Sequence, residues 1–312
     1  MGFIFFCKNF KFQKMNIGML LLTSFPPDIR VEKEIDSLEY NNKIFLLCPL
    51  RNNKPKIEIT EKLTIIRVFN TIERWLSNIE VLYRIKSILW IRYIRNFVKD
   101  YKIDVLHVHD LPLLYSAHIV AKELNIKLVS DLHENYPEML AENLKLPISS
   151  ISSIPHLFKR FINIKKWKKY EETILNKVDS IIVVVDESKN RLINELKIND
   201  SKIYVVPNYD KPSHKNKKIS GNGKLSFFYA GGFDYIRDLH TVLDAYSILP
   251  VEIKNEIEVT LIGGTGNDLK KLSNYCKNLK LNKNVQILGY VPFDEMLKIM
   301  VKADVGLVPH VK

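Results

Sequence analysis

Short runs of hydrophobic residues recur along the first two thirds of the chain, and most are followed by a helical pattern of apolar positions. The runs do not alternate strictly between apolar and polar residues and are rich in Val, Ile and Leu, which is typical of strands buried on both faces. Strands that alternate with helices predict a parallel sheet with right-handed crossovers. The predicted strands lie at 16–22, 43–48, 103–108, 127–132, 179–185 and 203–206.

A polar and basic segment then interrupts this pattern. Residues 207–224 contain two prolines and two glycines without apolar periodicity, which is typical of a linker. Strands resume at 225–230, 257–262, 285–288 and 304–308, and a length of 312 residues also favours about two domains. We predict an α/β protein with a first domain over 1–206, in which 1–14 form a loose tail, a linker over 207–224 and a second domain over 225–312.

The second predicted domain ends unusually. Its last strand is followed by only Pro309, His310, Val311 and Lys312, whereas strands in such sheets are normally followed by a covering helix. We therefore expect a partial, C-terminally truncated second domain.

Composition fits an ordinary globular protein, with 46 % hydrophobic and 26 % charged residues, and excludes a disordered or fibrous chain. The formal net charge of +12 favours anionic partners without choosing between nucleic acid, an anionic bilayer and phosphorylated small molecules. Three cysteines with no C-x-x-C spacing disfavour a disulfide framework and a zinc site. No apolar run approaches the roughly 18 residues of a membrane span, and we predict a cytoplasmic protein.

Polar side chains follow several predicted strands of the first domain, where ligands of open α/β sheets bind. The first strand leads to Asp28 and Arg30, the 103–108 strand to His109 and Asp110, the 127–132 strand to His133 and Glu134, and the 179–185 strand to Asp186, Glu187 and Ser188. We predict a site at this edge of the sheet.

Each of these residues also has a purely structural interpretation. His107 and His109 can be satisfied core or rim residues, and Asp186 or Ser188 can cap the following helix. A metal cluster of His107, His109, Asp110, His133 and Glu134 has suitable ligand types, but no further ligand motif supports a metal hydrolase. We therefore expect no metal.

Two glycine-rich turns end neighbouring strands of the second domain. Gly231 and Gly232 precede Arg237, and the next strand ends in Gly263, Gly264, Thr265 and Gly266. Glycine turns at strand ends let backbone N–H groups approach a phosphate, and an arginine can bind it through two hydrogen bonds. These turns predict a nucleotide site in an interdomain cleft.

Together these motifs resemble the GT-B fold glycosyltransferases of family 4. The resemblance runs from about Met15 to the end of the chain and rests on FPPDIRVEKE (25–34), DVLHVHDLPLL (104–114), LVSDLHENYPE (128–138), KVDSIIVVV (177–185), VVPN (205–208), YAGGFDYIRDL (229–239), LIGGTG (261–266) and LGYVPFDEM…ADVGLVP (288–309). It implies two Rossmann-like domains facing across a cleft.

The resemblance also implies a function and roles for residues. It implies a hexosyltransferase-type enzyme of cell-surface polysaccharide or glycoconjugate synthesis, which moves a sugar from a nucleoside diphosphate sugar to a saccharide or lipid-linked acceptor, with retention of configuration and without a metal or other cofactor. His133 matches the family histidine that lies against the donor sugar, and Glu134 is its neighbour at the reaction centre. The implied donor residues are Gly231, Gly232, Arg237, Gly264 and Gly266, and the implied acceptor-side residues are Asp28, Arg30, His109 and Asp110.

The sequence departs from the family pattern in two places. Phe233 stands where the family commonly has an arginine, so that Arg237 matches the second of two phosphate-binding cations and Lys270 or Arg30 would have to replace the first. The family's E-x7-E segment, expected soon after Pro309, is absent from this sequence.

Two basic, aromatic segments, at 72–99 and 154–170, have amphipathic patterns. Such helices can lie in an anionic membrane interface, at the inner face of the cell membrane, or their apolar stripes can cover the sheet. The alternatives to a glycosyltransferase are a GT-B sugar-nucleotide epimerase, an inactive glycosyltransferase remnant and a nucleic-acid-binding protein. We expect no nucleic-acid partner, because no motif for one is present.

Overall fold

The computed structural model describes residues 14–50, 54–61, 63–145, 162–209, 223–281 and 283–310. The chain divides into two compact units, with the described residues up to Tyr209 in unit 1 and those from Gly223 onward in unit 2. Residues 1–13 of the predicted tail, 210–222 of the predicted linker and 154–161 of the second amphipathic segment lie outside the described residues.

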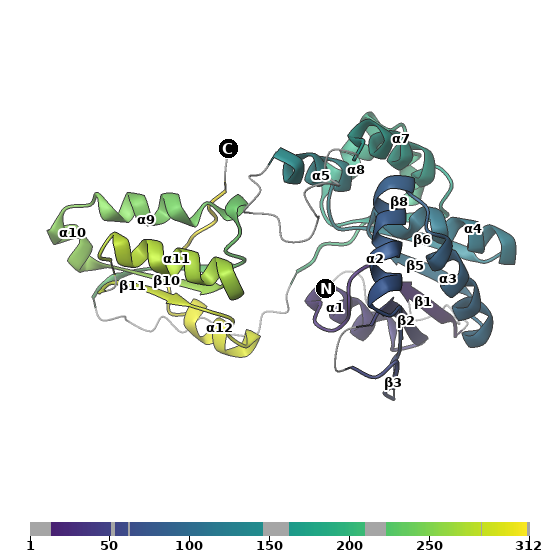
Figure 1. Cartoon of the computed structure of the whole chain (residues 1–312), viewed down its shortest axis with the longest axis horizontal. Helices are drawn as coiled ribbons and strands as arrows, with labels where there is room; N and C mark the ends of the chain where they lie inside the picture. Colours follow the sequence, from purple (N-terminus) through teal and green to yellow (C-terminus); the bar gives the residue numbers. More distant parts are fainter. Residues whose placement is uncertain are drawn as a thin grey trace. The chain divides into compact units, whose positions relative to one another are not determined.

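Unit 1 contains an eight-stranded sheet, drawn in Figure 1. All neighbouring strands are parallel except β3, which is antiparallel to β4. In spatial order the strands are β3 (Ile57–Ile59), β4 (Leu63–Val68), β2 (Lys43–Pro49), β1 (Asn16–Leu20), β5 (Val105–His109), β6 (Lys127–Leu132), β7 (Ser180–Val183) and β8 (Ile203–Val205). The six strands predicted for the first domain and their parallel arrangement are confirmed.

The strands β3 and β4 were not predicted from the sequence. Arg67 interrupts the apolar run of β4, yet its side chain is fully buried. It donates hydrogen bonds to the carbonyl oxygens of Phe25 and Pro55 and pairs with Glu58 of β3 at 2.7 Å. A buried arginine is tolerated where its N–H groups are satisfied in this way, and local sequence does not reveal those partners.

The two faces of the sheet bury different sets of side chains. On one face, Leu106 and Val108 of β5 and Leu132 of β6 join a large core with buried residues of α3, α4 and α7. On the other, β1 and β2 pack against α1. Side chains alternate between the two faces along a strand. His107, which stands between Leu106 and Val108 on β5, therefore points to the side of the sheet that α1 covers.

Helices connect the strands within the described residues of unit 1. They are α1 (Ile29–Leu38), α2 (Thr71–Ile79), the π-helix η1 (Glu80–Arg84), α3 (Ile88–Tyr101), the 3-10 helix η2 (Leu111–Leu113), α4 (Leu114–Leu124), α5 (Tyr136–Lys145), α7 (Ile164–Leu175), α8 (Asp186–Asn194) and the 3-10 helix η4 (Asp200–Lys202).

Unit 2 contains a four-stranded parallel sheet in the order β11 (Val285–Leu288), β10 (Ile257–Gly263), β9 (Leu225–Gly231) and β12 (Val305–Gly306). These are the four predicted strands, although β12 is shorter than predicted. Residues of α9 (Leu239–Ser247) and α11 (Gly266–Asn278) pack with β9 and β10 in one core, and Figure 1 shows α12 (Phe293–Met300) on the opposite side of the sheet. The described part of unit 2 also contains η5 (Tyr235–Arg237) and α10 (Val251–Glu256).

Candidate functional site

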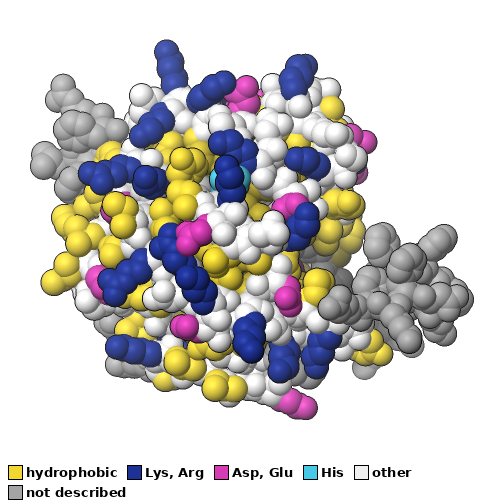
Figure 2. Space-filling model, turned by 90° about the vertical axis from the view of Figure 1, so that its right-hand side faces the viewer, with side chains coloured by type: hydrophobic (Ala, Val, Ile, Leu, Met, Phe, Trp, Pro, Cys, Tyr) yellow, Lys and Arg dark blue, Asp and Glu magenta, His cyan; other side chains and the backbone are white. Residues whose placement is uncertain are grey.

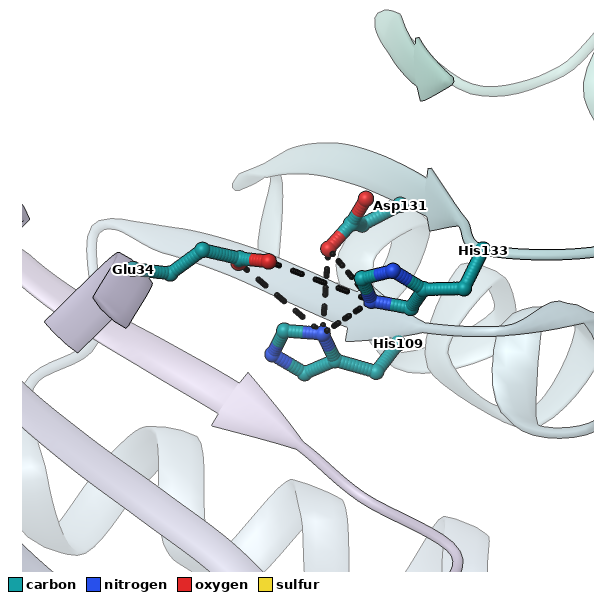
Figure 3. Close-up of side chains that lie close together, drawn as sticks. All are labelled: Glu34, His109, Asp131 and His133. Carbon is teal, nitrogen blue, oxygen red and sulfur yellow. Dashed lines mark hydrogen bonds and ion pairs between the residues drawn. The ribbon is translucent and has the colours of Figure 1, made fainter. Parts of the chain in front are cut away.

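Three histidines and two carboxylates meet on the α1 side of unit 1. In the β5–β6 ladder His109 stands opposite Asp131, and His107 lies two residues before His109 on the same face. Asp131 Oδ2 is 3.2 Å from His107 Nε2, 3.0 Å from His109 Nδ1 and 3.2 Å from His133 Nε2. Glu34 reaches in from α1, with Oε2 3.3 Å from His107 Nε2. Figure 3 shows four of these side chains pointing toward one another.

Burial makes the charges of this histidine cluster (Glu34, His107, His109, Asp131 and His133) interact strongly. Burial disfavours a charged His107, but hydrogen bonds and attraction from Asp131 and Glu34 outweigh it and raise the pKa of His107 to about 9. Burial likewise opposes the charge of Asp131, but the three imidazoles hold its pKa far below the usual range. The pKa of His133 is raised, because Asp131 and Asp110 outweigh burial.

A second group of charged residues lies beside His133. The backbone N–H of His133 donates to Asp110 Oδ1 at 3.3 Å, and Arg30 pairs with Asp28 at 3.0 Å. Burial raises the pKa of Glu134, as does the charge of Asp110, while Arg30 acts in the opposite direction. The carboxyl groups of Asp28, Asp110 and Glu134 therefore all lie near the guanidinium of Arg30.

Asp110 itself has an unusual backbone. Its φ of 61° lies in a region that residues other than glycine rarely adopt. Such strain is concentrated at functional sites, where surrounding contacts hold it in place. Burial raises the pKa of the Asp110 carboxyl, opposed by His133 and Arg30.

The structure brings together six of the nine residues that the sequence indicated at this edge of the sheet. Hydrogen bonds, ion pairs or charge interactions connect the members of the predicted set, namely Asp28, Arg30, His109, Asp110, His133 and Glu134. The structural interpretation of His107 is also confirmed, since it is buried and ion-paired. Asp186, Glu187 and Ser188 lie at the start of α8, and no described contact joins them to the other six residues. The N-cap of α8 is Val185 and has no side-chain cap bond, so the capping interpretation of Asp186 or Ser188 is wrong.

Sequence reasoning missed Asp131 and Glu34. Asp131 lies two residues before His133 on a buried strand, so the period of two would have placed both on one face. Glu34 follows Arg30 by one helical turn in α1, but no local pattern shows which strand α1 covers.

The same side chains could hold a metal ion. Glu34, His109, Asp131 and His133 each offer one ligand atom, and these atoms lie within 4.8 Å of one another. Imidazole and carboxylate are suitable ligands for zinc. The alternative use of the cluster is a hydrogen-bonded network in which a protonated His107 balances the charges of Asp131 and Glu34.

A pocket of about 490 Å³ adjoins the histidine cluster. Its polar lining includes Glu34, His107, Asp131 and His133 of the cluster, and Lys33, Ser37 and Asn208 outside it. The apolar lining comes from β1, α1, β5, β6, β7 and the residues after β8. A ligand here could therefore contact a charged edge and an apolar surface together.

In unit 2 the two glycine turns lie side by side. Gly263 stands opposite Gly231 in the ladder, and the N–H of Gly264 donates to the carbonyl of Gly231 at 3.3 Å. Gly263 has a φ of 132°, and a Cβ there would lie 1.8 Å from the Gly231 oxygen. Gly266 begins α11, so this turn leads directly into a helix N-terminus.

The departure at Phe233 has a structural reason. Its side chain is buried in the core of unit 2 and packs on Gly264, where a Cβ would come within 2.1 Å of the ring. The ring therefore occupies space beside the second turn. Arg237 is exposed at the end of η5, and its charge reaches Tyr229, whose hydroxyl donates to the Gly232 carbonyl at 2.7 Å.

Family models match both units of the chain. The model of Glycosyltransferase Family 4 matches residues 41–209, and that of Glycosyl transferases group 1 matches residues 210–311. The capsular polysaccharide biosynthesis glycosyltransferase CapH of Staphylococcus aureus is 25 % identical over 196 residues, which cover 62 % of this chain and 50 % of CapH. The chain thus spans about half the length of this curated relative.

Solved structures share the fold at low sequence identity. Sucrose-phosphate synthase from Thermosynechococcus elongatus has a TM-score of 0.66 and 13 % identity, covering 95 % of this chain and 76 % of that one. The lipopolysaccharide outer core galactosyltransferase WaaB has a TM-score of 0.61 and 15 % identity, covering 94 % and 74 %. HepE of Anabaena in complex with UDP has a TM-score of 0.60 and 14 % identity, covering 96 % and 75 %. With its two Rossmann-like domains of the GT-B fold, the chain belongs to glycosyltransferase family 4.

Proposed function

We propose that the protein transfers a hexosyl group from a nucleoside diphosphate sugar to a saccharide or lipid-linked acceptor in polysaccharide or glycoconjugate synthesis. The observation that carries the proposal is the placement of His133 in a buried, charged cluster of a family 4 domain, together with paired glycine turns in the second unit. HepE binds UDP in its solved complex, which supports a nucleotide donor.

The donor would bind unit 2 through its diphosphate. Gly232 and Gly266 leave room for backbone N–H groups to approach phosphate oxygens, and the N-terminus of α11 adds a favourable dipole. Gly231 and Gly264 would shape the turns, since the Gly264 N–H donates to the Gly231 carbonyl and the Phe233 ring lies against Gly264. Arg237 would neutralise the charge that develops on the leaving diphosphate, and such preorganised electrostatics is commonly the largest part of catalysis.

His133 would contact the donor sugar. Its Nε2 faces Asp131, whereas Nδ1 has no hydrogen-bond partner among the residues that the structure describes. Asp131 therefore fixes the ring, and the buried Nδ1 is the nitrogen that would have to be uncovered to meet a sugar hydroxyl. Glu134 would act beside it at the reaction centre.

The acceptor would approach unit 1 at the charged group beside His133. Asp28 and Asp110 offer hydrogen-bond acceptors to hydroxyl groups, and Arg30 supplies a positive charge. The buried His109 would act on this side through His133, whose Nε2 lies 3.4 Å from His109 Nδ1. We further propose that the reaction proceeds with retention of configuration and without a metal, as the family resemblance implies.

Product analysis with the full chain tests the proposal. Nucleoside diphosphate sugars are incubated with saccharide acceptors, and NMR identifies the products. Release of the nucleoside diphosphate with a new glycoside of unchanged anomeric configuration is expected, and His133→Ala should abolish it whereas His118→Ala, on α4, should not. Interconversion of nucleotide sugars without an acceptor would instead identify an epimerase, and no turnover of any donor would overturn the proposal.

A further inference from the structure

The amphipathic segments of the sequence differ in what their apolar stripes meet. The stripe of α2 is largely exposed, with Ile72 at 71 %, so the expectation that it covers the sheet is wrong there. No helix in the described ranges has the length and hydropathy to cross a bilayer. In α7 the lysines within residues 165–169 are exposed, and Figure 2 shows one face of the protein on which Lys and Arg side chains are more frequent than Asp and Glu. The stripe of α7 meets the expectation, because Trp167 and Tyr170 lie in the large core of unit 1. Tyr170 thus brings a hydroxyl group into an apolar core.

The hydroxyl of Tyr170 is satisfied by the chain that follows Asp110. It donates to the carbonyl oxygen of Leu111 at 2.9 Å and accepts from the backbone N–H of Tyr115 at 2.9 Å. Leu111 begins η2, and Tyr115 is the second residue of α4, a helix whose N-cap residue makes no side-chain hydrogen bond. The hydroxyl therefore takes the place of a capping side chain and joins the two helices that follow β5.

The side chain of Tyr170 is itself fixed. The residue is 7 % exposed, and its ring lies 5.6 Å from that of Trp167 at an interplanar angle of 77°. Trp167 donates from Nε1 to the carbonyl of Leu82 at 3.1 Å, and Glu171 pairs with Arg191 of α8 at 2.6 Å. Contacts on both sides of Tyr170 therefore anchor α7 and hold the hydroxyl in one place.

The residue before Leu111 has a backbone that needs support. Asp110 has a φ of 61° and a ψ of 167°, a combination that is essentially confined to glycine. Its N–H donates to the carbonyl of Asp131 at 2.8 Å, and its carboxylate accepts from the N–H of His133 at 3.3 Å. Contacts with β6 and the residue after it thus hold Asp110 on one side, and η2 has to hold it on the other.

The Tyr170 hydroxyl limits how η2 can move. One oxygen atom holds the carbonyl of Leu111 and the N–H of Tyr115, so the segment after Asp110 cannot turn to relieve the strain of its backbone. Strained residues persist only where surrounding contacts over-determine them. Loss of the hydroxyl would free both groups and let the Asp110 carboxylate move away from the His133 N–H.

We propose that Tyr170 is a positioning residue of the candidate site, whose hydroxyl holds Asp110, and through it His133, in the arrangement that sugar transfer uses. The effect on transfer rests on the proposed function, in which His133 meets the donor sugar and Asp110 the acceptor. The effect on the geometry of Asp110 and His133 does not depend on any substrate.

The variant Tyr170→Phe tests the geometry, because it removes one oxygen atom and keeps the ring. The backbone amide resonance of His133 is followed by NMR in the 15N-labelled full chain, since this N–H binds Asp110 Oδ1. Asp110→Gly is the reference, because it removes the carboxylate and leaves a residue that tolerates the backbone conformation. We expect Y170F to shift the His133 resonance in the same direction as D110G.

A matched control variant is Tyr246→Phe. In unit 2 the Tyr246 hydroxyl is likewise held by a backbone carbonyl, that of Lys254 at 3.0 Å, so Y246F should leave the His133 resonance unchanged. Circular dichroism and the melting temperature show that each variant is folded. A His133 resonance that Y170F does not move would overturn the proposal, even if the melting temperature fell, because Tyr170 would then only stabilise the core.

A double-mutant cycle tests the effect on transfer. Y170F should lower the kcat for release of nucleoside diphosphate from UDP- or GDP-hexoses about tenfold, because a small displacement of catalytic groups is costly. Its affinity for UDP or GDP in calorimetry should stay that of the wild type. In the D110G background Y170F should cost less than about twofold more, since nothing is left for it to position.

Two results would overturn the proposal on this side. Losses that multiply in the double variant would show that Tyr170 acts independently of Asp110. A shifted His133 resonance with unchanged turnover would show that the arrangement does not serve the reaction. If the wild type turned over no nucleotide sugar, the proposed function would fail, and the His133 resonance would still decide whether Tyr170 positions Asp110.

Discussion

The buried His107 should make the stability of unit 1 depend on pH in a defined way. Its pKa is raised from 6.5 to about 9 by Asp131 and Glu34 in spite of burial. A group whose pKa is higher in the folded state stabilises that state fully below its unfolded pKa, and the contribution is lost as the pH rises through the folded pKa. For His107 it is therefore complete below about pH 6 and absent above about pH 10.

The size of the effect follows from the same two values. At about 1.4 kcal/mol for each pH unit, the protonated His107 contributes about 3 kcal/mol to the unfolding free energy at about pH 5.5 and about 2 kcal/mol at about pH 7.5. His107→Gln keeps a polar side chain without the charge. We expect its destabilisation relative to the wild type to shrink by about 3 kcal/mol between about pH 5.5 and pH 10.

Urea unfolding followed by tryptophan fluorescence measures this difference for unit 1 alone. All three tryptophans of the chain, Trp75, Trp90 and Trp167, lie in that unit. The control His118→Gln should behave oppositely, because burial and nearby lysines lower the pKa of His118, and its removal should stabilise the protein at acid pH. A destabilisation by His107→Gln that is equal at acid and alkaline pH would refute the reasoning.

Three further predictions concern the same site and the second unit. Asp131→Asn leaves buried imidazoles without their anion, so it should lower the pKa of His133 and reduce the unfolding free energy of unit 1 by about 3 kcal/mol or more. NMR titration measures the pKa, and an unchanged His133 titration would contradict this. Gly264→Ala should destabilise unit 2 by about 1–3 kcal/mol in calorimetry, because its Cβ would collide with Phe233. Gly306→Ala, where no atom lies within 4 Å of the added Cβ, should have a smaller effect, and equal losses would count against the packing argument. Donor turnover should survive EDTA, with no stoichiometric metal in elemental analysis, whereas a chelator-sensitive activity would assign a metal to the histidine cluster.

Strands made of a continuous apolar run could be predicted from the sequence alone. Runs such as 179–185 and 257–262 are confirmed as strands because burial on both faces demands continuous apolar residues. β4 was missed because Arg67 breaks its run, and only the distant carbonyl oxygens of Phe25 and Pro55 explain why that arginine is buried. Local pattern does not reveal partners that are far apart in the chain.

In the site, too, local pattern predicts some residues, and others are placed only by tertiary packing. His133 and His109 follow strands whose order the chain reveals, so their proximity was predictable. Glu34 reaches them from α1, and only the tertiary packing of α1 places it there. The amphipathic segment that begins at residue 72 was ambiguous for a related reason: Ile72, Trp75 and Leu76 of α2 are largely exposed rather than packed on the sheet, because an amphipathic pattern gives the apolar face of a helix but not what that face meets.

Calorimetric titration of the full chain with UDP, GDP, ADP and CMP tests the central claim most directly, namely that a nucleoside diphosphate sugar is the donor. We predict binding of one nucleoside diphosphate, weakened about tenfold or more by Arg237→Gln and unchanged by I57S/I59S in unit 1. The bound nucleotide should also raise the melting temperature of unit 2, because a ligand that binds only the folded state stabilises it. No binding of any of the four nucleotides to a folded chain would contradict the account.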